Sequence, residues 1–132
     1  MITKLEIVKL HHVAIICSNY QKSKQFYTEV LGFEIAQEIY RADRKSYKLD
    51  LSLNGQYLIE LFSFQEPPQR LTRPEATGLR HISFAVKNIE NAVQYFNSIN
   101  IITEQIRIDE HTNRKFTFLK DPDNLPIEIY EL

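Results

Sequence analysis

The hydrophobic pattern of this chain predicts short strands and two helices. Residues 9–17 and 79–86 are rich in Val, Ile and Phe, and they alternate or run apolar as strands do. A helix is expected after each of these strands, with Asn19 and Asn88 as N-caps. We expect the first helix to end at Gly32. The second has one apolar stripe at the spacing i, i+3, i+4 and i+7, formed by Ile89, Ala92, Val93 and Phe96.

Three further strands are predicted after each helix. They span about 33–42, 46–54 and 56–63 in the first half of the chain, and about 101–108, 113–120 and 125–131 in the second. The dipeptide Asn54-Gly55 is typical of a two-residue hairpin, and residues 121–124 form a turn of another kind. Residues 64–78 contain three prolines and no periodicity, so we expect an irregular linker there.

The two halves of the chain are similar to each other in sequence. A shift of 69 positions places the segment 10–15 over the segment 79–84, and it places Asn19 over Asn88. The chain therefore consists of two copies of one strand–helix–three-strand unit. This repeat predicts an α+β fold built from two βαβββ modules, with a curved mixed sheet and the helices on its outer face.

Composition and charge narrow the range of functions. The 132 residues are 43% hydrophobic and 25% charged, and the net charge of -1 gives no basic excess for nucleic acid or acidic membranes. No GxGxxG or Walker motif occurs, and no apolar stretch approaches the ~20 residues of a membrane helix. The lone Cys17 suits a buried apolar position in a reducing compartment. We expect a cytoplasmic protein with a small-molecule partner.

Each half carries a His followed by a Glu at nearly the same spacing. His12 precedes Glu60 by 48 positions, and His81 precedes Glu128 by 47. Because side chains alternate along a strand, each His and its Glu lie on the same face of the sheet. The opposite face of the first strand is apolar and should pack on the helix through Val13, Ile15 and Cys17. The two His–Glu pairs therefore occupy the faces turned away from the helices, with room for a ligand.

Two imidazoles and two carboxylates that meet at one point form a good site for a divalent ion. A single His or Glu on a strand is more often a surface residue, so the prediction of a metal site depends on finding the same His-to-Glu spacing twice. We interpret the four residues as ligands of one ion of Zn, Ni, Mn, Co or Fe. The remaining histidines fit less well: His11 should point to the opposite face from His12, and His111 falls in a turn. Both are expected to be structural or surface residues.

Several motifs carry a resemblance to a known family. They are an opening His-x-Ala-Ile strand, Phe-Tyr-x-x-Val-Leu-Gly-Phe (26–33), Gly-Leu-Arg-His-Ile-Ser-Phe (78–84) and Asp-Pro-Asp-Asn-x-Pro-Ile-Glu-Ile (121–129). Together they resemble the vicinal oxygen chelate superfamily, which includes glyoxalase I, fosfomycin-resistance thiol transferases, methylmalonyl-CoA epimerase, extradiol dioxygenases and bleomycin-binding proteins. The resemblance implies that each module curls into a half-barrel and that two half-barrels form a cup around a metal.

The resemblance also implies a domain organisation. It covers about residues 9–131 and predicts one domain over residues 1–132. Module 1 spans about 9–63, the linker spans 64–78, and module 2 spans about 79–131. The cup can form within one chain or by exchange of modules between two chains, and we expect a symmetric homodimer.

The glyoxalase I ligand set, carried over by resemblance, falls on the same four residues, His12, Glu60, His81 and Glu128. It implies a metal-dependent lyase or isomerase that acts on a small α-oxo or hydroxy-carbonyl compound through a metal-stabilised enediolate. In that pattern a ligand glutamate moves a proton between neighbouring carbons. Glu128 is the first candidate for this base and Glu60 the second. The substrate pocket is expected to be lined by Leu58, Phe62 and Tyr130.

Two positions depart from the glutathione-dependent enzymes. Ile16 and Phe64 stand where those enzymes usually carry an Arg and an Asn that hold the tripeptide. We therefore do not expect a standard glutathione-dependent enzyme. The alternatives are a metal-dependent thiol transferase, epimerase or dioxygenase of the same superfamily, and an antibiotic-binding protein without catalysis. Candidate anchors for an anionic substrate are Arg70, Arg73 and Arg114, although a single arginine of this kind is more often a solvated surface residue.

Overall fold

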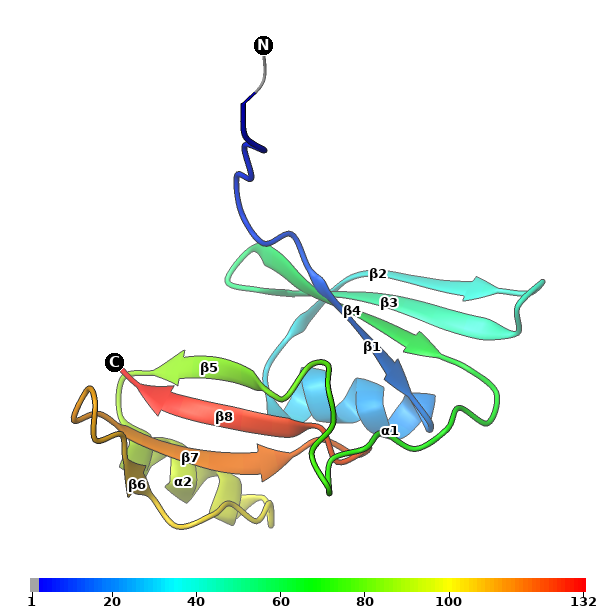
Figure 1. Cartoon of the computed structure of the whole chain (residues 1–132). Helices are drawn as coiled ribbons and strands as arrows, with labels where there is room; N and C mark the ends of the chain where they lie inside the picture. Colours follow the sequence, from blue (N-terminus) through cyan, green and yellow to red (C-terminus); the bar gives the residue numbers. More distant parts are fainter. Residues whose placement is uncertain (1–2) are drawn as a thin grey trace. The chain divides into compact units, whose positions relative to one another are not determined.

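The computed structural model of this chain describes residues 3–132. It contains two compact units, of which unit 1 ends at Pro67 and unit 2 begins at Pro68. Each unit has one four-stranded mixed sheet with a helix on one face (Figure 1). The repeated strand order confirms the predicted α+β fold of two βαβββ modules.

Unit 1 has the sheet order β1-β4-β3-β2, in which β1 runs parallel to β4 and the other neighbours are antiparallel. Its elements are β1 (Val13–Cys17), α1 (Tyr20–Gln25), the π-helical turn η1 (Phe26–Val30), β2 (Glu34–Arg41), β3 (Ser46–Leu53) and β4 (Gln56–Ser63). The turn between β3 and β4 is the predicted hairpin, since Asn54 and Gly55 both have positive φ angles, 51° and 78°.

Unit 2 repeats this arrangement with the sheet order β5-β8-β7-β6, in which β5 runs parallel to β8. Its elements are β5 (Ile82–Val86), α2 (Ile89–Ser98), β6 (Arg107–Ile108), β7 (Lys115–Lys120) and β8 (Pro126–Glu131). Helix α2 contacts β7 and β8 (Figure 1). Residues 64–78 contain no helix or strand, as predicted for the linker, and the strand predicted from residue 79 begins only at Ile82.

Both predicted N-caps are confirmed. The side chain of Asn19 accepts a hydrogen bond from the Lys22 amide at 3.1 Å, and Asn88 accepts one from the Asn91 amide at 2.8 Å. These bonds satisfy amide groups that a helix leaves unpaired at its start. The predicted end of the first helix at Gly32, where φ is +82°, is also confirmed.

Two predicted elements differ from the structure. The first helix widens into η1, where the Leu31 amide donates to the Phe26 carbonyl, and side-chain spacing does not reveal such a π-turn. The strand predicted over 101–108 is reduced to β6, at residues 107 and 108. At the start of this segment the Ile101 amide donates to the Phe96 carbonyl at 2.8 Å and so closes the end of α2, and the Glu104 amide donates to the Phe118 carbonyl of β7 at 2.9 Å.

The buried face of each sheet is the one that alternation predicts. In unit 1 Ile15, Cys17 and Leu61 are buried, and in unit 2 Ile127 and Ile129 are buried. Side chains of the other parity remain partly exposed on the opposite face, where the candidate site residues lie. Within residues 3–132, no helix has the length and apolar character that a membrane crossing needs.

Candidate functional site

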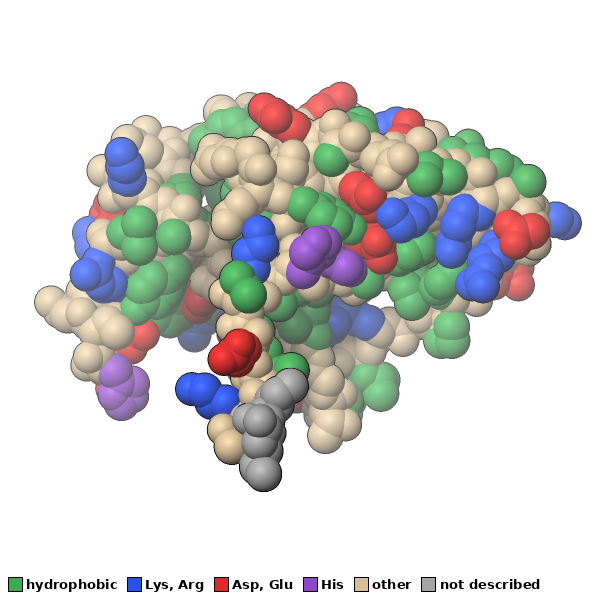
Figure 2. All heavy atoms as spheres, turned by 90° about the horizontal axis from the view of Figure 1, so that it is seen from above, with side chains coloured by type: hydrophobic (Ala, Val, Ile, Leu, Met, Phe, Trp, Pro, Cys, Tyr) green, Lys and Arg blue, Asp and Glu red, His purple; other side chains and the backbone are tan. Residues whose placement is uncertain are grey.

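The two His–Glu pairs have the same geometry in the two units. Nε2 of His12 lies 3.8 Å from Oε1 of Glu60, and Nε2 of His81 lies 3.8 Å from Oε1 of Glu128. Both glutamate side chains are 16% exposed. Histidine side chains reach the molecular surface, with acidic and basic groups beside them (Figure 2).

Strand register produces this repeated geometry. Glu60 lies opposite Ala14 in the parallel β1–β4 pair, and Glu128 lies opposite Ser83 in the β5–β8 pair. Each His stands two residues before that small partner, so its ring is a diagonal neighbour of the Glu on one sheet face. Because Ala14 and Ser83 have small side chains, they leave each His–Glu pair open to solvent.

In unit 1, Glu60 belongs to a polar network. Its Oε2 accepts a hydrogen bond from the Tyr57 hydroxyl at 3.0 Å and lies 3.3 Å from Nζ of Lys48. Lys48 also donates to Asp50, and the Tyr57 ring stacks on that of His12 with centroids 5.1 Å apart. Burial raises the pKa of the Tyr57 hydroxyl, so it remains a donor, and the hydrogen bond to Asp50 raises the pKa of Lys48.

In unit 2, the cross-strand neighbour of Glu128 is aromatic. The residue directly opposite Glu128 on β7 is Phe118, whereas Glu60 faces Asp50 on β3. The Phe118 ring packs edge-on against His81 at 5.1 Å. Within unit 2, His81 is the side chain to which the Glu128 carboxylate is paired. The two modules therefore share one pair geometry but differ in what holds the glutamate.

The other two histidines have different positions. Contrary to the prediction, His11 does not point away from His12, because the two ring Nδ1 atoms lie 2.8 Å apart. Strict alternation fails there because β1 begins only at Val13. His11 remains exposed, as expected of a structural or surface residue. The side chain of His111 is 87% exposed in a turn, which agrees with the prediction.

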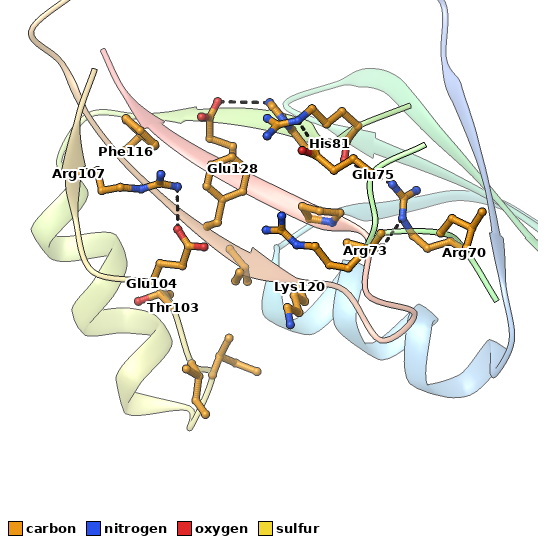
Figure 3. A pocket seen from close by; sticks show the side chains of 18 of the residues that line it. Arg70, Arg73, Glu75, His81, Thr103, Glu104, Arg107, Phe116, Lys120 and Glu128 are labelled. Carbon is orange, nitrogen blue, oxygen red and sulfur yellow. Dashed lines mark hydrogen bonds and ion pairs between the residues drawn. The ribbon is translucent and has the colours of Figure 1, made fainter. Parts of the chain in front are cut away.

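Unit 2 contains a concave pocket of about 970 Å³ over the open face of its sheet. Its floor includes Phe116, Phe118 and Glu128, and His81 lies at one side (Figure 3). One wall comes from the linker, which contributes Arg70, Arg73 and Glu75, and from Arg80 just after it. Arg70 and Arg73 are two of the candidate anchors for an anionic substrate, but a linker without a periodic pattern gives no indication that it forms a pocket wall.

The residues expected to line a substrate pocket lie on the same sheet faces as the glutamates. Leu58 and Phe62 flank Glu60 on β4, and Phe62 stacks on Phe64 with ring centroids 6.1 Å apart. Tyr130 lies two residues beyond Glu128, and its hydroxyl donates to Asp109 at 3.0 Å. Tyr130 does not border the unit 2 pocket, and its role in substrate binding stays a prediction.

Residues around Glu60 were missed at the sequence level. Lys48 and Asp50 are two residues apart on β3 and therefore share one face of the sheet, and Tyr57 lies just after the hairpin turn on β4. The Asn54-Gly55 turn pairs Leu53 with Gln56, and counting back from it without interruption would pair Asp50 with Ile59 and not with Glu60. A bulge between Leu51 and Ser52 shifts the register, and no sequence pattern reveals it.

Each His–Glu pair suits a divalent metal in its donor chemistry and spacing. Imidazole nitrogen and carboxylate oxygen bind such ions at about 2.1 Å, which places neighbouring donors about 3.0–3.5 Å apart. The observed 3.8 Å separations need only small side-chain rotations. No group of three or more His, Cys, Asp or Glu side chains suited to a metal occurs among the described residues, and each pair contains one His and one Glu.

Sequence comparison identifies the family. Residues 9–129 match the glyoxalase/bleomycin resistance protein/dioxygenase superfamily. The chain belongs to this superfamily. The structural likeness agrees, since a glyoxalase family protein from Enterococcus faecalis has a TM-score of 0.87 at 47% identity, over 94% of this chain and 98% of that one.

Two bacterial proteins of similar length are also similar to this chain in sequence. The protein YwkD of Bacillus subtilis (strain 168) is 60% identical over 92% of this chain and 95% of its own length. YaeR of Escherichia coli (strain K12) is 53% identical over 96% of this chain and 98% of its own. More distant similarity, at 27% identity, extends to the lactoylglutathione lyase of Schizosaccharomyces pombe and a methylmalonyl-CoA epimerase of Dictyostelium discoideum.

Proposed function

We propose that this glyoxalase superfamily protein is a divalent-metal-dependent lyase or isomerase that acts on a small α-oxo or hydroxy-carbonyl compound. In this proposal His12, Glu60, His81 and Glu128 supply the protein ligands, from one chain or from two chains of a dimer. The observation that carries it is the repeated 3.8 Å His–Glu geometry on the open face of both sheets. The lyase and epimerase among the distant relatives support the choice of reaction class.

A divalent ion held by this set would act as a Lewis acid toward adjacent substrate oxygens. The protein must then supply a base that can move a proton between neighbouring carbons. Glu128 suits this role better than Glu60. Lys48 and Tyr57 hold Oε2 of Glu60 in place, whereas Glu128 lies against Phe118 and pairs with His81. A carboxylate with fewer anchors can rotate toward a substrate carbon at lower cost.

The environment of module 1 argues against a glutathione carboxylate subsite of the usual kind. Ile16 is 51% exposed and Phe64 is 39% exposed, at the positions that resemble the tripeptide-binding Arg and Asn of glutathione-dependent enzymes. Neither side chain can pair with a carboxylate. We therefore propose a reaction that does not require glutathione.

The test has a binding part and a chemical part. Chelator-treated protein is titrated separately with Zn²⁺, Ni²⁺, Mn²⁺, Co²⁺ and Fe²⁺, and each loaded form is incubated in D₂O with a panel of α-oxo and hydroxy-carbonyl compounds. Proton NMR then follows exchange of the hydrogen on the carbon beside the carbonyl group. We expect one ion per four-ligand site, and exchange that depends on the metal and disappears in Glu128→Gln.

Other results would assign another function. Oxygen consumption with catechols would indicate a dioxygenase, and opening of an epoxide by a thiol would indicate a transferase. Failure of the wild-type protein to bind any of the five ions would contradict the proposal and favour a binding protein without catalysis.

A further inference from the structure

The pocket of unit 2 carries an excess of cationic side chains. Five of them line it, namely Arg70, Arg73, Arg80, Arg107 and Lys120. Three carboxylates line the same pocket, namely Glu75, Glu104 and Glu128. Apolar side chains, among them Phe116 and Phe118, lie between these groups. Apolar neighbours strengthen the attraction of a cation for an anion, because they reduce screening by water.

Three of the five cations have partners within unit 2. Nε of Arg80 lies 2.5 Å from Oε1 of Glu75, and Nη2 of Arg107 lies 2.8 Å from Oε2 of Glu104. These pairs neutralise each other, and the guanidinium of Arg80 lowers the pKa of the Glu75 carboxyl. The third, Arg70, donates hydrogen bonds within unit 2.

Arg70 fastens the linker wall. Its Nη2 donates to the Leu79 carbonyl at 2.9 Å, and its Nε donates to Oγ1 of Thr72 at 2.8 Å. Thr72 in turn donates to the Asn124 carbonyl, in the turn before β8. The linker is thereby tied to itself and to the sheet, so that Arg73 is held beside the pocket.

Arg73 and Lys120 are the two cations left available. Neither side chain forms a hydrogen bond or a close ion pair with another described residue of unit 2, although the charge of Arg73 adds to that of Arg80 in lowering the pKa of the Glu75 carboxyl. Lys120 ends β7 opposite Pro126, and Glu128 is the next residue of β8 on the same face. A diagonal neighbour of this kind lies roughly 7 Å away. Arg73 reaches from the linker toward the pocket interior (Figure 3).

We propose that Arg73 and Lys120 form an anion-binding subsite, which holds a carboxylate or phosphate group of the substrate. Such a group bound at this rim leaves the rest of a small molecule to extend over Phe118 toward His81 and Glu128. A guanidinium and an ammonium together suit an oxyanion, since both donate charge-assisted hydrogen bonds. The orientation of the substrate rests on the proposed function, whereas binding of the anion does not.

The test uses metal-free full-length protein, so that its outcome is independent of the metal. Pyruvate, inorganic phosphate and hydroxyacetone are titrated separately at constant ionic strength, and backbone amide chemical shifts are followed by NMR. Pyruvate and hydroxyacetone share a carbonyl group, but only pyruvate carries a carboxylate. We expect saturable shifts around the unit 2 pocket with pyruvate or phosphate, and none with hydroxyacetone. The anion that binds with the higher affinity indicates whether the subsite prefers a carboxylate or a phosphate group.

The decisive variant is Arg73→Gln/Lys120→Gln, compared with Arg44→Gln/Lys87→Gln. Both remove two positive charges from exposed positions, but Arg44 and Lys87 lie outside the pocket. We expect at least a tenfold loss of anion affinity in the first variant and wild-type affinity in the second. Equal losses in both, unchanged affinity in the first, or no saturable binding to the wild type would overturn the subsite. Loss of metal binding or turnover with the subsite intact would instead count against the proposed function.

Discussion

Nε2 of His81 lies 3.8 Å from Oε1 of Glu128, and this carboxylate has no second anchor within the described residues of unit 2. The same separation occurs between His12 and Glu60, but there Tyr57 and Lys48 hold the other carboxylate oxygen. The duplicated modules thus retain one geometry with two different supports. Each support leads to its own experimental prediction.

Replacement of Glu128 by Gln should abolish turnover while metal remains weakly bound. The amide keeps an oxygen donor but cannot accept the proton, so we expect a loss of at least about 10²-fold in the solvent-exchange rate. Metal binding is measured by titration calorimetry and exchange by NMR. His111→Ala should change neither, because the His111 side chain is 87% exposed. Full exchange activity in Glu128→Gln would show that another group is the base.

Replacement of Tyr57 by Phe should weaken metal binding by about tenfold, a typical effect of losing a group that orients a ligand. The change removes the hydroxyl that donates to Glu60 at 3.0 Å but keeps the ring stacked on His12. Tyr40→Phe is the matched control, since Tyr40 is exposed on β2. Metal titration of the two variants distinguishes them. An unchanged affinity in Tyr57→Phe would mean that the hydrogen bond does not orient Glu60.

Two isoleucines of unit 2 test the assignment of the sheet faces. Ile127 is fully buried, so Ile127→Ala should lower the free energy of unfolding by about 3 kcal/mol. Ile102 is 88% exposed, and Ile102→Ala should change the free energy of unfolding by less than about 0.5 kcal/mol. Urea denaturation measures both values. Similar losses for the two variants would contradict the assignment of the buried face.

A pH-dependent contribution to stability is expected from Glu38, which joins β2 to α1. The hydrogen bond from Lys24 at 2.7 Å, followed by the one from Tyr20, lowers the pKa of the Glu38 carboxyl from its ordinary value of 4.5. A lowered folded-state pKa stabilises the fold above the ordinary value, and this stabilisation disappears as the pH falls through the lowered pKa.

Glu38→Gln should therefore lower the free energy of unfolding at pH 7 by about 1 kcal/mol, a value reduced by partial exposure of the pair. The difference from wild type should shrink below pH 4.5 and vanish once Glu38 is protonated in both states. Denaturation at a series of pH values checks this. Glu34→Gln, on the same strand at an exposed position, should show no such trend. A constant difference across the pH range would rule out the ionised carboxylate as its source.

Much of the fold follows from local rules. Asn19 and Asn88 cap helices because their side chains satisfy amides a few residues later, and Asn54-Gly55 forms the hairpin because both residues accept positive φ angles. Alternation placed Ile15 and Ile127 in the buried layers. Local rules failed at His11 and at Ile101, which both lie just outside a strand. The His11 ring contacts the ring of His12, and the Ile101 amide donates to the Phe96 carbonyl.

The sequence by itself determined the duplicated modules and the common face of each His–Glu pair, because periodicity and spacing are properties of the chain. Only the tertiary structure decided what surrounds the two glutamates: Asp50, Tyr57 and Lys48 beside one, and Phe118 beside the other. It also decided that the linker forms a pocket wall with Arg73 at its rim. Such neighbours depend on cross-strand register, a bulge and loop hydrogen bonds, which bring together residues that no short-range pattern relates.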